Sequence, residues 1–480
     1  MSVRRLRQDR RFSRFGSTRN WIAAGVLLAA LPAVAQDSRR PTPEALAHPG
    51  PGSREAQFAA CQSDTAKDAH GADRPAAEVK STCDVDKIAS PAERRKMQAY
   101  VDSYVRKEDI VRTLKLPSGD IVDCVDMYKQ PAMRSAAMKG QRLQLLPSKA
   151  TLATDRAALA DERIRRQFGP DPKGAAEARP PKQEYGSESA VCPEKSVPIQ
   201  RITLDVLKNF RTLDDFFRKT PPKKGPTGLH QYAHAYRVID NRGAQSIFNV
   251  WGPYTNRSDE FSLSQIWVVR GSGANLETVE TGWQKYRDFY GDYRPRLFIY
   301  FTPDNYGSGG CYNLSCNAFV QVNNSVYIGG GFTNISQHPH PSTAWEFKLR
   351  WQKDGAEGHW WLKYGDTWVG YYPRNKFDSN GLRSQAGEVD FGGEIIDRQT
   401  GGQHTSTDMG SGHFPGDGFG FAAYQRQIRY ITPGNVWGTY PSLTDTRSDK
   451  DCYDIKVNSS SGGWERYFYF GGPGYNSNCE

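Results

Sequence analysis

The sequence lacks the signatures of the commonest metal and nucleophile sites. It contains no H-E-x-x-H pair, no C-x-x-C or Cys/His pattern with zinc-ligand spacing, and no G-x-S-x-G segment. These absences argue against a zinc peptidase, a zinc-bound domain and a serine hydrolase with its nucleophile at a strand–turn–helix junction. Lys and Arg number 63 against 53 Asp and Glu, but no nucleic-acid-binding motif accompanies the excess of positive charge. We therefore expect no metal, no cofactor and no nucleic-acid partner.

The sequence also lacks a long hydrophobic run beyond residue 35. Its N-terminus has a basic cluster at residues 4–11 and then an apolar stretch at residues 21–35, which is too short for a permanent membrane helix. This stretch ends in Ala-Val-Ala at residues 33–35, the small-x-small pattern of a signal-peptide cleavage site. We expect residues 1–35 to be a signal peptide and the mature protein to be secreted or periplasmic, without a membrane anchor.

Cysteine is scarce but even in number, with eight residues in the chain. In an exported protein, an even set without zinc-ligand spacing favours disulfide bonds. Sequence alone does not determine which cysteines pair, so other pairings stay open. The pairs that we predict are Cys61–Cys83, Cys124–Cys192, Cys311–Cys316 and Cys452–Cys479.

Aromatic residues are nearly absent from residues 36–90, which are rich in Pro, Ala, Ser and Asp. Such a composition cannot bury enough apolar surface to fold alone, so we predict a disordered linker over these residues. The character then changes, because apolar residues recur with helical spacing between residues 92 and 116. Residues 120–132 alternate like a strand.

A charged segment at about residues 150–186 is typical of a partly helical insertion. Residues 204–217 have the apolar spacing of one amphipathic helix. A cluster of Pro, Lys and Gly at residues 219–226 then breaks regular structure. We therefore predict a small α+β domain over residues 91–220, followed by an exposed linker.

After residue 228 helical periodicity nearly vanishes, and every tryptophan except Trp21 lies beyond this point. Frequent Gly and Asn supply turns between short apolar runs, which predicts an all-β sandwich or barrel over residues 228–480. In the clearest strand the apolar residues Trp345, Phe347, Leu349 and Trp351 alternate with polar ones, as in a half-buried strand. The strands that we predict lie at residues 264–269, 296–301, 318–322, 344–352 and 360–364.

Two glutamates stand among apolar or glycine neighbours. Glu280 lies in E-T-V-E-T-G-W at residues 277–283, and Glu394 lies in F-G-G-E-I-I at residues 391–396. A carboxylate in an apolar strand must be paired or used, because burying it uncompensated costs free energy. Two neighbouring carboxylates cannot both ionise cheaply, so one keeps a proton and the pair offers both an acid and a base. Amide hydrolysis needs both of these groups.

The sequence resembles the neprosin family of secreted, proline-specific glutamic endopeptidases in seven segments that follow the same order. They are E-T-G-W at 280–283, Y-G-D at 290–292, P-R-L-F-I-Y at 295–300, C-Y-N-L-x-C at 311–316, G-G-E-I at 392–395, H-T-x-T-x-M-G-S-G-H-F-P at 404–415 and F-Y-F-G-G-P-G at 468–474. The resemblance implies an all-β catalytic domain, a sandwich of two strongly bent antiparallel sheets, with Glu280 and Glu394 as the catalytic pair. It also implies a preceding activation domain, to which residues 120–132 and 192–199 are similar.

Five further residues are candidates for the cleft. His404 and His413 do not have a helical metal-ligand spacing, and Ser411 does not stand in a nucleophile turn. We expect these three to brace the cleft through hydrogen bonds rather than to form a serine triad or a metal site. Trp283 and Tyr300 belong to an aromatic excess that is usually core, but aromatic faces also stack well on a proline ring.

We therefore predict a secreted, monomeric glutamic endopeptidase that cleaves proline-containing peptides or proteins on the C-terminal side of proline. Its own N-terminal domain is expected to act as an inhibitor until acid triggers a cut between about residues 219 and 229. Two alternatives stay open. One is a non-enzymatic, carbohydrate-binding β-sandwich, and the other is a glycosidase that uses the same two carboxylates.

Overall fold

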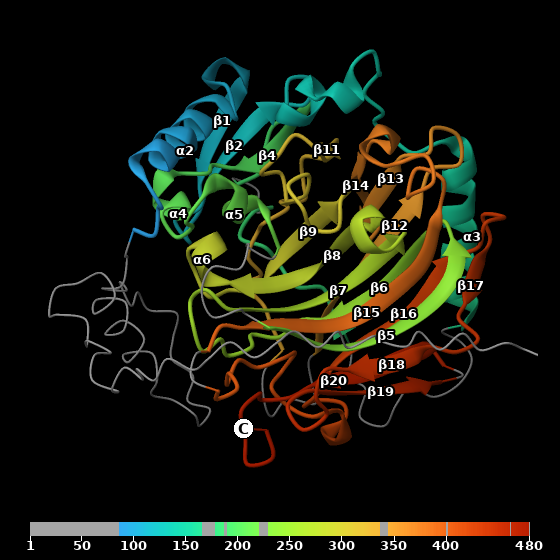
Figure 1. Cartoon of the computed structure of the whole chain (residues 1–480). Helices are drawn as coiled ribbons and strands as arrows, with labels where there is room; N and C mark the ends of the chain where they lie inside the picture. The colour runs from blue at the N-terminus through green and yellow to red at the C-terminus, as the bar shows by residue number, and fades with distance from the viewer. Residues whose placement is uncertain are drawn as a thin grey trace, which may run out of the picture. The chain divides into compact units, whose positions relative to one another are not determined.

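A computed structural model describes residues 86–165, 178–186, 190–219, 229–336, 344–399, 402–460 and 462–479. We call residues 86–219 the N-terminal region and residues 229–479 the C-terminal region. Helices gather in the N-terminal region and strands dominate the C-terminal region (Figure 1). This is the predicted all-β domain preceded by a smaller α+β region.

The N-terminal region is built around a three-stranded antiparallel sheet in the order β1-β2-β4. Its first helix begins at Ser90, whose side chain accepts a hydrogen bond from the backbone N–H of Glu93, and Pro91 occupies the first helical position. Among the described residues, no helix is long and apolar enough to span a membrane. The elements are α2 (Pro91–Ser103), β1 (Ile110–Lys115), β2 (Ile121–Asp126), α3 (Lys149–Arg165), β3 (Ala178–Arg179), β4 (Ser196–Gln200), α4 (Leu204–Leu207) and α5 (Leu213–Phe217).

Two predictions for this region are wrong in detail. Residues 204–217 form two short helices rather than one, because Thr212 and Asp215 make a capping box that starts α5 afresh. The predicted disordered linker ends before residue 90, since Ile88 is buried in an apolar cluster and Lys87 pairs with Asp288 at 2.7 Å. Residues 36–85 lie outside the described part of the chain.

The C-terminal region contains two large sheets. One has seven strands in the order β10-β9-β8-β7-β15-β5-β18, and the other has ten and includes β11-β14-β13-β12-β6-β16-β20-β19. Strand β17 pairs with β16, and the short β3 of the N-terminal region adds to β12 in parallel. The seven strands are β5 (Leu229–Asn241), β7 (Phe261–Arg270), β8 (Glu277–Tyr286), β9 (Arg296–Thr302), β10 (Cys311–Tyr312), β15 (Ala386–Asp397) and β18 (Thr444–Arg447).

The ten-stranded sheet and the short helices complete the region. Its own strands are β6 (Gly243–Asn249), β11 (Val320–Gln321), β12 (Ala344–Lys353), β13 (Trp360–Tyr364), β14 (Thr367–Tyr372), β16 (Ala423–Ile431), β17 (Trp437–Thr439), β19 (Asp454–Ser459) and β20 (Arg466–Gly471). A single helical turn, α6 (Arg287–Tyr290), follows β8. The predicted strands at 264–269, 296–301, 344–352 and 360–364 are confirmed, whereas only residues 320–321 of the stretch 318–322 form a strand.

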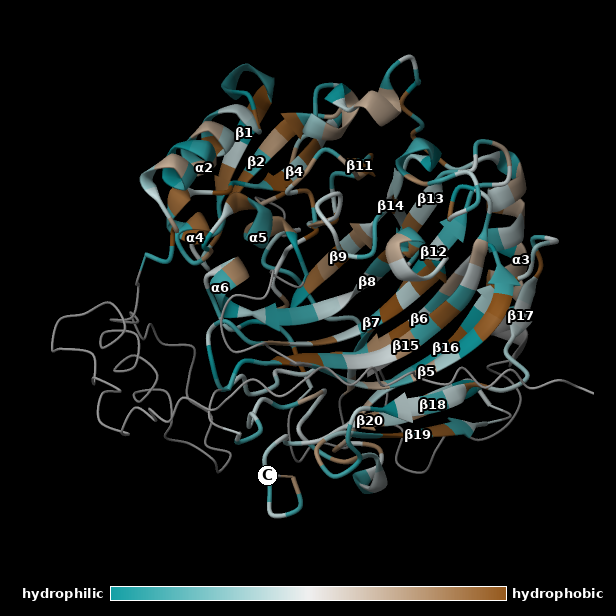
Figure 2. Ribbon diagram, viewed as in Figure 1, coloured by the Kyte–Doolittle hydropathy of each residue, from teal (hydrophilic) through white to brown (hydrophobic). Residues whose placement is uncertain are grey.

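The core of the C-terminal region lies between the two large sheets. Hydrophobic and hydrophilic bands alternate along the long strands (Figure 2), as expected when one face of each sheet is apolar. On β12, Phe347, Leu349 and Trp351 belong to this core, as predicted. On the opposite, polar face of β12, Lys348 is half-buried, and Arg350 is only 1% exposed because Asp155 of the N-terminal region and Trp437 of β17 both contact it.

Three of the four predicted disulfides are present. They join Cys124 to Cys192, Cys311 to Cys316 and Cys452 to Cys479. The first connects β2 to the segment just before β4, so it staples the small sheet. The predicted pair Cys61–Cys83 lies outside the described residues.

Candidate active site

Strand register brings Glu280 and Glu394 to the same face of the seven-stranded sheet. Glu280 lies on β8 and Glu394 on β15, and β7 runs between these two strands. On β7, Trp267 is opposite Glu280 and Leu263 is opposite Glu394. Because Trp267 and Leu263 are four residues apart, their side chains share a face, and so do the two glutamates. This face is the one turned away from the core.

A lysine of the N-terminal region lies between the two glutamates. Lys219 Nζ is 2.7 Å from an oxygen of Glu280 and 2.7 Å from an oxygen of Glu394. The backbone N–H of Lys219 donates to the hydroxyl of Tyr300 at 3.2 Å, and its ammonium lies 5.2 Å from the centre of the Trp267 ring. Lys219 is 3% exposed, so the predicted exposed linker is buried at this residue. Residues 220–228 lie outside the described part of the chain.

Each glutamate has its second oxygen held by other side chains. The hydroxyls of Thr278 and Tyr306 both donate to Glu280 at 2.8 Å. His230 Nδ1 lies 2.5 Å from Glu394, and the amide of Gln265 donates to the other Glu394 oxygen at 3.2 Å. Both glutamates are buried, so these neighbours fix where the carboxylate oxygens point.

The electrostatics of the site favour an ionised Glu394. Burial on its own would raise the pKa of Glu394, but Lys219 and His230 together outweigh it and hold the pKa below the usual value. Burial would conversely lower the pKa of Lys219, and the two glutamates outweigh it and raise that pKa. Burial and the nearby carboxylates raise the pKa of Tyr306, which stays a protonated donor.

Of the two aromatic cleft candidates, one lies at the site and one does not. Tyr300 is opposite Glu280 on β9 and contacts Lys219, as described above. Trp283 is completely buried between the sheets, where its indole N–H donates to the carbonyl of Asn249 on β6 at 2.9 Å. Trp283 is three residues from Glu280, and residues an odd number apart on a strand face opposite ways. Its prediction as a cleft residue is therefore wrong.

The three polar candidates lie in the segment that follows β15. His404 Nδ1 lies 2.8 Å from the carbonyl of Thr405, and His413 Nδ1 lies 2.8 Å from Asp417. The hydroxyl of Ser411 accepts from the backbone N–H of His413 at 3.3 Å. These contacts brace the segment itself, whereas the groups around Glu280 and Glu394 come from other elements.

Sequence reasoning missed Lys219, His230, Gln265, Thr278 and Tyr306. The sequence did contain a signal for His230, because residues 230–236 alternate as H-Q-Y-A-H-A-Y. This alternation is typical of a strand, but strand β5 was not predicted. In the structure Ala233 and Ala235 of this strand face the core, and His230 and Tyr232 share the opposite face. No comparable local signal exists for Lys219, whose role depends on contacts 61 residues away along the chain.

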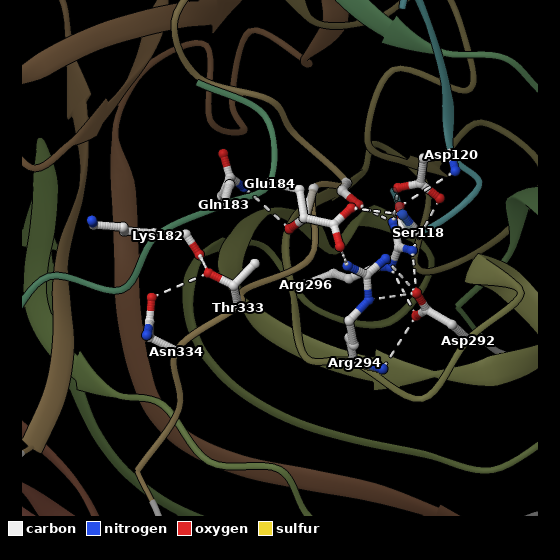
Figure 3. Close-up of polar contacts among 12 residues, drawn as sticks. Ser118, Asp120, Lys182, Gln183, Glu184, Asp292, Arg294, Arg296, Thr333 and Asn334 are labelled. Atoms are coloured by element: carbon white, nitrogen blue, oxygen red, sulfur yellow. Dashed lines mark hydrogen bonds and ion pairs between the residues drawn. The ribbon is translucent and has the colours of Figure 1, made fainter. Parts of the chain in front are cut away.

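A charge network also fixes the N-terminal region beside β9 (Figure 3). Arg296 of β9 is fully buried and bonds to Asp120 of the N-terminal region and to Asp292, each at 2.7 Å. Arg294 bonds to Glu184 at 2.7 Å. Burial would lower the pKa of Arg296, but the two aspartates raise it well above its usual value. The N-terminal region thus contributes carboxylates to two arginines of the C-terminal region.

Comparison with known proteins finds two matching family models and several solved structures. The model described as Neprosin matches residues 258–473, and the model described as Neprosin activation peptide matches residues 113–239. A solved structure of Scytalido-glutamic peptidase with a peptide-based transition state analogue is 13% identical, covers 52% of this chain and 100% of its own, and has a TM-score of 0.30. SCP-B, of the Eqolisin family of peptidases, in complex with a tripeptide Ala-Ile-His, is 10% identical with the same coverage and a TM-score of 0.28.

Proposed function

Because the chain is a peptidase of the neprosin family that carries the family's activation peptide, we propose that it is a prolyl endopeptidase of the glutamic type whose catalytic groups are Glu280 and Glu394. One observation carries the assignment of these groups: Lys219 Nζ reaches an oxygen of each glutamate at 2.7 Å. A water molecule in the place of that ammonium would lie within hydrogen-bond distance of both carboxylates. This is the geometry that a two-carboxylate hydrolysis requires.

The neighbours of the two glutamates support different roles for them. When Lys219 leaves, His230 stays beside Glu394 and favours its ionised form, so we assign the general base to Glu394. Glu280 then holds the shared proton. Glu394 takes a proton from water as the water oxygen attacks the peptide carbonyl carbon. Glu280 gives its proton to the leaving nitrogen as the C–N bond breaks, and a carboxylic acid and an amine result.

Preference for proline is supported by the aromatic surroundings of the pair. Trp267, Tyr300 and Tyr306 all lie beside the Lys219 side chain or the carboxylates that it binds. Tyr300 and Tyr306 are stacked, with ring centres 5.9 Å apart. Aromatic faces pack well on a rigid apolar ring, and cleavage on the C-terminal side of proline is what the family resemblance implies.

Latency follows from the same contact. Lys219 occupies the position proposed for the water, so the uncut chain is inactive, and the N-terminal region is the inhibitor. Glu394 has a lowered pKa in the folded state, so its attraction for Lys219 is present above the usual glutamate value and is lost as the pH falls through the lowered one. Acid therefore weakens this contact and exposes the linker to a cut between about residues 219 and 229. The cut is irreversible, so Glu394 ionises again in the processed enzyme, where His230 favours the charged form.

Export is also part of this proposal. The basic cluster, apolar stretch and Ala-Val-Ala site of residues 4–35 support a signal peptide. The disulfides Cys124–Cys192, Cys311–Cys316 and Cys452–Cys479 suit an oxidising compartment. We propose a secreted or periplasmic enzyme that acts on proline-containing peptides or proteins.

A matched pair of peptides tests the function. The purified protein is incubated at acid pH with a peptide that contains one proline and with the same peptide carrying alanine there, and the fragments are identified by mass spectrometry. We expect cleavage after proline in the first peptide only. Equal cleavage of both would contradict the prolyl specificity, and cleavage of neither by the processed protein would contradict the peptidase assignment. N-terminal sequencing of the processed band locates the activating cut.

A further inference from the structure

Asp155 of helix α3, in the N-terminal region, binds two buried cations of the ten-stranded sheet. Lys363 Nζ of β13 lies 2.7 and 2.9 Å from the two carboxylate oxygens of Asp155. Arg350 of β12 also bonds to Asp155. In Figure 1 the helix runs along the side of the C-terminal region, next to β12 and β17.

The alternation of β12 and β13 puts both cations on the outer face of the sheet. Leu349, Trp351 and Leu362 belong to the core between the sheets. Arg350 lies between two of these residues in sequence and Lys363 follows the third, so both face the opposite way. They are nevertheless buried, and Asp155 of the N-terminal region contacts both of them.

Side chains of the C-terminal region also contact these cations and orient the guanidinium of Arg350. The side-chain oxygen of Gln245 accepts from Arg350 Nε at 3.1 Å and from Nη2 at 2.5 Å, which leaves Nη1 for Asp155. The Trp437 ring centre lies 4.3 Å from the Arg350 guanidinium, and the Trp368 ring centre lies 5.4 Å from Lys363 Nζ. Each cation thus lies near one indole ring, and the two neighbouring cations together bind one carboxylate.

Contacts at both ends of α3 extend this site. Before its first turn, the backbone N–H of Ser148 donates to Asp354 at 2.6 Å, and the hydroxyl of Thr151 donates to the same oxygen at 3.0 Å. Further along, Asp161 pairs with Arg429 of β16 at 3.2 Å. The helix is thus bound along its length by polar groups of the outer face, with the buried carboxylate of Asp155 in the middle.

We propose that Arg350 and Lys363, with Trp437 and Trp368 beside them, form a carboxylate-binding exosite whose partner is helix α3 of the chain's own N-terminal region. The contact does not depend on the linker, so it holds the N-terminal region on the C-terminal region after the linker is cut. This inference rests on the proposed function only in that the linker is the place of the cut. The activated protein is then a two-chain complex in which the Lys219 arm leaves the cleft while α3 stays bound.

Other contacts between the regions agree with retention. Val125 of β2 and Ile199 of β4 belong to the same apolar cluster as Leu314 and the core of the C-terminal region. The Arg296–Asp120 pair is a second buried charge contact across the same boundary. The exosite adds to this association, and its contribution is the difference in dissociation rate between the parent protein and Asp155→Asn.

The test uses the full chain with a recognition site for an added, specific protease inserted between residues 222 and 226. The cut is made with that protease, so the outcome does not depend on the chain's own activity, and failure of the proposed function leaves the test intact. Size-exclusion chromatography then shows whether the two pieces elute together. We expect co-elution for the parent protein and at least tenfold faster dissociation for Asp155→Asn.

Asp366→Asn is the matched control. Asp366 is an exposed carboxylate 4.0 Å from Lys363 that belongs to the C-terminal region itself, so its loss should leave co-elution unchanged. Equal retention by the parent and Asp155→Asn, or immediate separation of the parent, would overturn the proposal.

A competition experiment needs no variant of the protein. A synthetic peptide of residues 148–161 is added in excess to the cut parent complex, and the same peptide with Asp155→Asn serves as its control. We expect the first peptide to speed release of the N-terminal region and the second to have no effect. If both peptides act equally, or neither acts, the carboxylate of Asp155 does not define the site and the proposal fails.

Discussion

Two buried groups of three charges join the N-terminal and C-terminal regions, and their signs are opposite. One is the cleft at Glu280 and Glu394, and the other is the proposed exosite at Arg350 and Lys363. At the cleft, the N-terminal region supplies one cation, Lys219, to two carboxylates of the C-terminal region. At the exosite, it supplies one carboxylate, Asp155, to two cations of the C-terminal region. All of these side chains are buried, so neither group of three is stable if the odd charge is removed and nothing replaces it.

The two sites differ in the groups that the C-terminal region supplies. The C-terminal groups at the cleft are carboxylates, which protonation neutralises, and water can then take the place of Lys219. The C-terminal groups at the exosite are the cations Arg350 and Lys363, and the one carboxylate of this group, Asp155, belongs to the N-terminal region. Under the two proposals above, the contact at the cleft is a block that acid releases, and the contact at the outer face is an attachment that does not depend on the linker.

The largest expected effect is on turnover, which should depend on the proposed catalytic pair Glu280 and Glu394 but not on the nearby carboxylate of Glu277. Glu280→Gln and Glu394→Gln each keep shape and hydrogen bonding but cannot exchange a proton, so turnover of a proline peptide should fall more than a hundredfold. Glu277→Gln is the control on the same strand, because Glu277 accepts from the backbone of Asp378 and Leu382 instead. Near-normal turnover in either of the first two variants would remove that residue from the mechanism.

The next effect concerns the block itself. Lys219→Met removes the ammonium but keeps an unbranched side chain, and two close carboxylates without a cation repel each other and admit water. At a pH where the uncut parent is latent, the uncut variant should hydrolyse a small proline peptide at least tenfold faster. Gels confirm that the linker is intact. Lys96→Met, at an exposed lysine of α2, should stay as latent as the parent.

A smaller effect compares the two contacts directly as the pH falls. The pKa of Glu394 is lowered in the folded state, so release of Lys219 should begin only below the usual glutamate value of 4.5. Hydrogen exchange at residues 213–219 should then accelerate, while exchange at residues 149–161 of α3 stays slow, because Leu152 of α3 also packs against the apolar cluster around Trp361 and Trp368, which does not titrate. Simultaneous acceleration in both segments would show that the cleft and the exosite open as one unit.

The smallest effect is that of Glu260, a buried carboxylate outside both groups of three charges. Burial raises the pKa of Glu260 to about 7, although hydrogen bonds from Thr407, Arg398 and Thr405 lower it. The folded protein thus holds a proton that the unfolded chain loses above about 4.5, so stability should fall as the pH rises from about 4.5 to about 7. Thermal melts should drop by a few degrees over this range in the parent and by less in Glu260→Gln. An equal drop in both would assign the pH dependence to other groups.

The sequence by itself determined the fold class and the catalytic candidates. Strand signals are local, so four of the five predicted strands could be found from short apolar runs between turn residues, and the strand at 344–352 also from its alternation. Glu280 and Glu394 stood out because a carboxylate among apolar or glycine neighbours contradicts its surroundings. Alternation counted from Glu280 would also have excluded Trp283 from the cleft, and the Thr212–Asp215 spacing would have divided the helix at 204–217.

Only the tertiary structure decided what faces these groups. Strand order brings β8 and β15 to either side of β7, and no local pattern encodes which strands become neighbours. Lys219 reads in sequence as one more linker lysine, and Arg350 as one residue of a polar strand face. Their burial and their partners come from segments far away along the chain, since α5 delivers Lys219 to the cleft and α3 delivers Asp155 to Arg350. Long-range packing, rather than composition or periodicity, places these ordinary charges in two buried groups of three.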